Sequence, residues 1–101
     1  MITTKEEIEN SLNTWRAKQI SFLEKIEITD AQIERLLNWI VDSKVHVEKI
    51  TYDQTNAVIV SAIAQGHEVM EKLKAKQQIN LNARDKAEIK IRELEAQLQG
   101  N

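Results

Sequence analysis

The absence of proline constrains this chain more than any other feature of its sequence. Its 101 residues contain no proline and only two glycines, Gly66 and Gly100, whereas proline makes up about 5% of average usage. Sheet proteins need turns, and turns depend on glycine for positive φ angles and on proline for a fixed φ angle. Because helices tolerate a composition poor in both residues, the sequence predicts an all-α fold.

Length and composition indicate one small soluble domain over residues 1–101. Hydrophobic residues make up 42% of the chain and charged residues 30%, which is near ordinary globular usage. The longest uninterrupted apolar runs, 39–41 and 57–60, are far shorter than the roughly 20 residues of a membrane-spanning helix. The N-terminal MITTKEEIEN lacks a basic segment followed by an apolar one, so we expect a cytoplasmic protein without a membrane association.

The first helix is expected at about residues 4–26. Thr4 and Glu7 are spaced as a capping box, in which the threonine hydroxyl accepts a hydrogen bond from a free amide of the first turn. Apolar residues then recur at spacings of three, four or their sum, which is the period of an amphipathic helix. These residues are Ile8, Leu12, Trp15, Phe22 and Ile26.

A second helix is expected from about residue 29, because Thr29 carries two N-cap signals. Gln32 stands where it would complete a capping box with Thr29, and Ile28 and Ile33 occupy the two positions of a hydrophobic staple. These signals predict a very short connection at 27–28. Connections of this length usually join antiparallel neighbours, so the sequence predicts an antiparallel helical hairpin or bundle.

Residues 44–63 admit two interpretations. Dense β-branched residues and the alternation of Val45 and Val47 are typical of strands, and a β-hairpin could turn at 53–56. The helical interpretation places Val45, Tyr52, Ile59, Ile63 and Met70 on one face, with Thr51 and Gln54 spaced as another capping box. We favour the helix.

The C-terminal third, about 66–98, is predicted to be a coiled-coil helix. Spacings of four and three alternate from Leu73 through positions 77, 80, 84, 87, 91, 94 and 98, as in a heptad seam. The middle of the seam is polar, at Gln77, Asn80 and Arg84. Either a weakly packed stretch that sets the register or a helix break near 80–82 would explain this polarity.

The apolar residues of the predicted helices are the candidate protein interface. They cover a wide arc of the second helix, and a chain of this length has a small core, so we expect a protein partner and homo-oligomerisation to cover the remainder. Large aromatics are frequent interface anchors. The interface candidates are Trp15, Trp39, Ile40, Val47, Tyr52, Ile59, Ile63, Met70, Leu73, Ile91, Leu94 and Leu98.

No residue pattern indicates catalysis, a metal or a cofactor. Cysteine is absent, and the two histidines, His46 and His67, are 21 residues apart, whereas a transition-metal site needs three or four converging ligands. The sequence contains no nucleophile elbow, H-E-x-x-H, P-loop or dinucleotide motif. We therefore expect a protein without enzymatic activity.

These observations favour a non-enzymatic protein–protein interaction module, such as an adaptor, chaperone, assembly factor or regulatory factor, that acts through apolar helix faces. The alternative is a small nucleic-acid-binding regulator with a hairpin at 44–63 and a basic C-terminal helix. Acidic residues interleave with the lysines and arginines of that helix, and the formal net charge is −2. This charge pattern disfavours nucleic acid, which binds best to a net basic surface.

Overall fold

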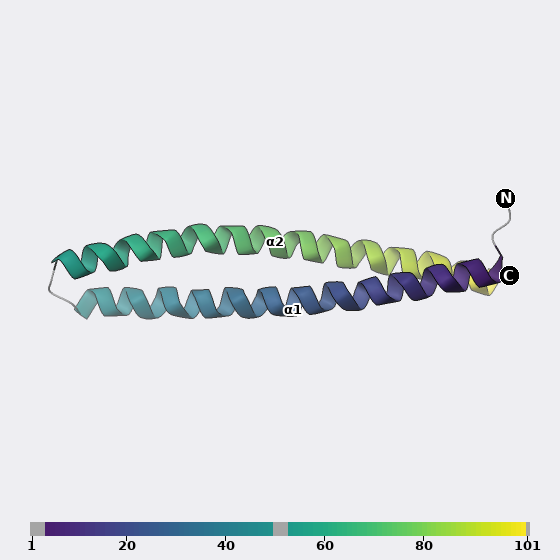
Figure 1. Ribbon diagram of the computed structural model, residues 1–101, viewed down its shortest axis with the longest axis horizontal. Coiled ribbons are helices and arrows are strands. Elements are labelled where there is room, and N and C mark those ends of the chain that lie inside the picture. The colour runs from purple at the N-terminus through teal and green to yellow at the C-terminus, as the bar shows by residue number, and fades with distance from the viewer. Residues whose placement is uncertain (1–3, 50–52, 101) are drawn as a thin grey trace. The chain divides into compact units, whose positions relative to one another are not determined.

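The fold is all-helical. The computed structural model describes residues 4–49 and 53–100, which form two helices, α1 (Lys5–Lys49) and α2 (Asp53–Gly100), packed as a hairpin (Figure 1). Those residues contain no strand. The predicted helical-hairpin fold is therefore confirmed.

The predicted start of the first helix is confirmed. α1 begins at Lys5, and the amide of Glu7 donates a hydrogen bond of 3.2 Å to the Thr4 hydroxyl oxygen. The amide of Ile8 donates to the Thr4 carbonyl oxygen over 3.1 Å. Thr4 is thus the N-cap, and its side chain satisfies one of the amides that the first turn leaves free.

The predicted helix break at 27–28 is wrong, as are the end of the first helix at 26 and the start of another at 29. α1 continues without interruption through Thr29, whose exposed fraction is 1%. Thr29 follows Phe22 and Ile26 and precedes Ile33 in the same alternation of three and four residues. The threonine therefore occupies a buried position against α2, and a break there would cost backbone hydrogen bonds and the heptad phase together.

The β-hairpin interpretation of 44–63 is wrong for the residues that the structure describes. Residues 44–49 end α1, and residues 53–63 begin α2. The single helical face expected from Val45 to Met70 is wrong as well, because these residues belong to two different helices. Tyr52 and the predicted cap at Thr51 lie outside the described residues.

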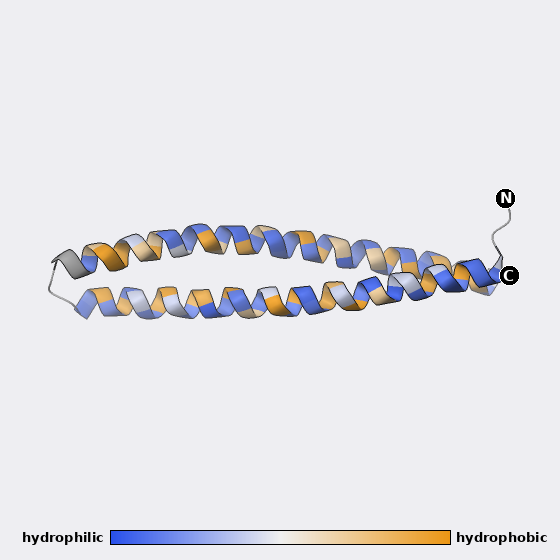
Figure 2. Cartoon of the chain, in the orientation of Figure 1, coloured by the Kyte–Doolittle hydropathy of each residue, from blue (hydrophilic) through white to orange (hydrophobic). Residues whose placement is uncertain are grey.

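Both helices carry a heptad seam. Every seam position of α1 is buried or half-buried, at 8, 12, 15, 19, 22, 26, 29, 33, 36, 40, 43 and 47. The same holds in α2 at 56, 59, 63, 66, 70, 73, 77, 80, 84, 87, 91, 94 and 98. The predicted C-terminal seam is confirmed, and α2 passes through 80–82 without a break. Hydrophobic residues accordingly recur along both helices (Figure 2).

The chain divides into two compact units. Unit 1 combines Met1–Glu27 with Gln78–Asn101, and unit 2 is Ile28–Gln77. The core of unit 1 contains Ile8, Leu12, Ile91 and Leu94, with Trp15 and Leu98 packed against it. The core of unit 2 contains Ile40, Ile63 and Met70, with Ile33, Leu36, Val47 and Ile59 packed against it. In each unit, residues of α1 therefore contact residues of α2.

Candidate functional site

Most of the predicted interface residues lie in the seam between the two helices of the same chain. Ile40, Ile63, Met70, Ile91 and Leu94 are buried in the two cores, and Trp15, Val47, Ile59, Leu73 and Leu98 are partly buried. Most of these ten side chains pack in the two cores, although Trp15 and Ile59 also line surface grooves. Trp39 differs, since 44% of it is exposed, and Tyr52 lies outside the described residues.

Apart from Trp39, the exposed apolar residues of the described chain were not among the predicted interface residues. Among the described residues, twelve large hydrophobic side chains are exposed, and eight of them belong to unit 2. The heptad phase could have revealed them, because they stand outside the seam of either helix. The unit 2 members are Ile28, Leu37, Trp39, Val41, Val45, Val58, Val60 and Val69.

Part of this surface is a stripe along α1. Leu37, Val41 and Val45 are four residues apart, so they share one face of the helix. About half of each residue is exposed. Because the seam of α1 already packs against α2, the stripe is a second apolar face on the same helix.

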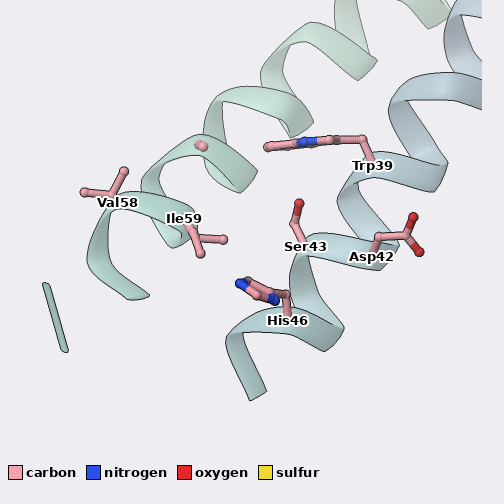
Figure 3. Close-up of a pocket in the computed structure, with 7 residues that line it drawn as sticks. Trp39, Asp42, Ser43, His46, Val58 and Ile59 are labelled. Carbon is pink, nitrogen blue, oxygen red and sulfur yellow. The ribbon is translucent and has the colours of Figure 1, made fainter. Parts of the chain in front are cut away.

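A shallow apolar groove on unit 2 lies beside Trp39. It encloses about 470 Å³ and is lined from α1 by Trp39, Asp42, Ser43 and His46, and from α2 by Val58, Ile59 and Ala62. The rings of Trp39 and His46 extend toward α2, whereas the Asp42 carboxylate points away from the groove (Figure 3). The groove therefore presents a mainly apolar surface with two aromatic rings at its edge.

Gly66 explains how the Trp39 ring reaches α2. A Cβ atom placed on Gly66 would lie 3.2 Å from Trp39 Cζ3 and 3.3 Å from Ile40 Cγ1. Glycine in a helix costs about 1 kcal/mol relative to alanine. Its place in the seam of α2 is explained by the room that it leaves for the indole ring.

The polar side chains of this groove do not form a catalytic arrangement. Asp42, Ser43 and His46 lie within one turn of α1, yet no hydrogen bond joins them in the described part of the chain. A nucleophile and its base need to be within hydrogen-bond reach of one another.

Unit 1 carries a different groove, which is both aromatic and basic. It encloses about 450 Å³ between Trp15, Lys18, Ser21, Phe22 and Lys25 of α1 and Ala83 and Lys86 of α2. Lys18 Nζ lies 4.4 Å from the centre of the Trp15 ring, and Lys25 Nζ lies 5.7 Å from that of Phe22. Both distances are within the range of cation–π attraction.

A polar contact interrupts the apolar seam of unit 2. Gln77 is 8% exposed, and its Nε2 donates a hydrogen bond of 2.5 Å to Asp30 Oδ1. Thr29, the neighbour of Asp30, is buried in the same seam. Such polar positions in coiled coils favour one register of the helices at a cost in stability.

Clusters of potential metal ligands and membrane-spanning helices are both absent from the described residues. No group of three His, Cys, Asp or Glu side chains there could hold a metal ion. None of the described helical segments combines the length and apolar character of a bilayer span. No family model, curated protein or solved structure matches the sequence.

Proposed function

We propose that this chain is a non-enzymatic protein–protein interaction module, such as an adaptor, chaperone or assembly factor. The eight exposed apolar residues of unit 2, which lie on more than one face, supply its binding surfaces and also join copies of the chain to one another. The observation that carries this proposal is the position of these residues outside a seam that is already filled.

Five of the eight exposed residues are valines, and helix formation gives no reason for them. Valine loses side-chain freedom in a helix and forms helices less readily than alanine, leucine or lysine. At an exposed position it also contributes little burial energy. A binding partner that covers Val41 and Val45 would explain two of these valines, because exposed apolar patches commonly mark protein interaction sites.

The nucleic-acid alternative has less support. Its hairpin wing at 44–63 is replaced by helix in the described residues, and several basic side chains of α2 face acidic neighbours. Lys74 lies 3.8 Å from Glu71, Arg84 lies 3.1 Å from Asp85, and Lys90 lies 3.9 Å from Glu93. These pairs reduce the field that would attract a phosphate backbone.

Sedimentation velocity of the full chain over a range of concentrations tests the self-association. We expect the unmodified chain to sediment faster as its concentration rises, and the double variant Val41→Glu/Val45→Glu to remain monomeric. The matched control is Ile79→Glu/Ile89→Glu, which makes the same chemical change at exposed residues of unit 1. A compact monomer at every concentration of the unmodified chain would defeat the self-association.

Affinity capture with the same three chains tests the heterologous part of the proposal. Proteins from the native host that bind the unmodified chain and the unit 1 control, but not the Val41→Glu/Val45→Glu chain, would identify partners of this surface. Equal capture by all three chains would assign binding to another part of the molecule.

A further inference from the structure

We infer that the groove between Trp15, Phe22 and the three lysines of unit 1 binds an acidic amphipathic helix of a partner protein. This groove shares no residue with the surface of unit 2 proposed above. Binding at this groove can therefore be tested independently of association through unit 2.

The charges of the groove are uncompensated. Lys18, Lys25 and Lys86 converge on it from both helices, and none of them forms an ion pair with an acidic side chain among the described residues. The three ammonium groups give this groove a local positive charge beside its aromatic rings. A ligand that carries carboxylates would complement this charge.

The other flank of the same seam carries an ion pair between the two helices. Arg16 and Lys18 lie on opposite sides of the seam positions 15 and 19 of α1. Arg16 Nη2 lies 3.2 Å from Glu95 Oε1 of α2, so that flank satisfies its arginine within the chain. The contrast indicates that the lysine flank is specialised for a charge that comes from outside.

A helical peptide fits these observations better than a nucleic acid. By sequence, unit 1 contains eight lysines and arginines against nine aspartates and glutamates, whereas a polyanion favours a net basic surface. The Lys18 and Lys25 ammonium groups lie over the rings of Trp15 and Phe22, which covers faces on which bases would stack. A short helical segment with a few carboxylates can bind without a net basic surface, and it does not need an uncovered aromatic ring on which to stack.

The spacing of the lysines specifies the partner sequence. Lys18 and Lys25 are seven residues apart, which corresponds to about 10.5 Å along a helix. Trp15 and Phe22 have the same spacing as the lysines, so a partner helix should carry two acidic residues seven positions apart and two apolar residues seven positions apart.

Tryptophan emission provides the assay. Trp15 and Trp39 are the only tryptophans of the chain, so in a full-length Trp39→Phe background the emission reports on Trp15 alone. The probe is a synthetic helical peptide of alanine, leucine and glutamate, about 20 residues long so that it forms a helix, with the pattern given above. Its controls are a scrambled peptide and a peptide in which lysine replaces glutamate.

We expect the acidic probe to shift Trp15 emission saturably, and Lys18→Gln/Lys25→Gln/Lys86→Gln to weaken its binding about tenfold, since each exposed charge pair contributes modestly. The matched variant Lys44→Gln/Lys49→Gln/Lys72→Gln, with the same change in net charge on unit 2, should bind as the background does. Circular dichroism of both variants verifies that the helices are intact.

Four results would overturn the inference. The first is no saturable shift with the acidic probe, and the second is equal binding of the lysine peptide or the scrambled peptide. The third is equal weakening by the two triple variants. The fourth is binding of single-stranded DNA or anionic phospholipid vesicles at concentrations where the acidic peptide does not bind.

Discussion

The two units of this hairpin are built on the same heptad seam but present different surfaces. Unit 1 and unit 2 are nearly equal in length, yet four exposed large hydrophobic residues belong to unit 1 and eight to unit 2. The cross-helix ion pair Arg16–Glu95 lies in unit 1. In the seam, both units bury large apolar residues, such as Leu12 in unit 1 and Ile40 in unit 2, and both bury a polar residue, Asn80 in unit 1 and Thr29 in unit 2.

This difference shows that the heptad phase determines which residues pack between the helices. It does not determine which residues are exposed on their outer faces. In both units the seam combines large apolar residues with polar ones, which include Asn80 in unit 1 and Thr29 and Gln77 in unit 2. The outer faces differ more, because the exposed valines all belong to unit 2. We therefore expect substitutions in the unit 1 seam to affect folding and substitutions on the outer faces of unit 2 to affect association.

The largest effect is expected from Leu12→Ala in the core of unit 1. Leu12 is 4% exposed, and removing a buried leucine side chain costs about 2–5 kcal/mol through lost burial and the cavity that remains. Urea denaturation followed by circular dichroism measures the loss. The control is Leu23→Ala, the same change in the same unit at a residue that is 46% exposed. Equal losses for the two variants would contradict the assignment of the core.

Gly66→Leu in unit 2 should destabilise the fold by about 1–3 kcal/mol, which is typical of overpacking. The new side chain would crowd the Trp39 ring and Ile40, so Trp39 emission should also shift toward that of an exposed indole. At Gly100, where an added Cβ atom would meet nothing within 4 Å, the same substitution should change stability by less than about 0.5 kcal/mol. Similar behaviour at both glycines would show that Gly66 does not provide space for the ring.

Asp30→Ala should cost about 1 kcal/mol, because it removes the carboxylate that accepts a hydrogen bond from the largely buried amide of Gln77. Asp30→Asn keeps an acceptor oxygen at the same place and should lose less. Thermal unfolding monitored at 222 nm compares the two. If alanine and asparagine gave the same melting temperature as aspartate, the contact would not contribute to the stability of unit 2.

The smallest effect is expected at the exposed ion pair of unit 1. Arg16 and Glu95 are each about half exposed, and such pairs contribute about 0.2–1 kcal/mol. A double-mutant cycle with Arg16→Gln and Glu95→Gln should give a coupling energy within that range, and added salt should reduce it. A coupling that salt does not weaken would mean that the pair is better shielded from solvent than its exposure indicates.

Local signals predicted part of this fold well. The cap at Thr4 and the seam from Leu73 to Leu98 could be predicted because each depends on a few residues at fixed spacing. The same capping pattern at Thr29 misled the prediction. A capping box describes a helix end only when no other helix covers the threonine, and the sequence does not reveal that α2 packs against this position.

The candidate site was harder to predict. The same apolar heptad pattern in a sequence is produced by a helix that packs against another chain and by a helix that packs against its own chain. Ile40, Ile63, Met70, Ile91 and Leu94 were assigned to an interface with a partner, and the chain buries all five itself. The strand-like alternation in 44–63 arose in part from exposed valines, among them Val45, Val58 and Val60. Once the phase of the seam is known, these residues are the ones that folding alone does not explain.

The division of the chain also predicts an order of folding. Unit 2 is one continuous segment, and its contact between Asp30 and Gln77 spans 47 residues, whereas the Arg16–Glu95 contact of unit 1 spans 79. Closing a longer loop costs more chain entropy, and contacts between sequence neighbours form sooner. The segment from Ile28 to Gln77, unit 2, should therefore form the first contacts between the two helices. Unit 1 should form last during folding and open first during unfolding.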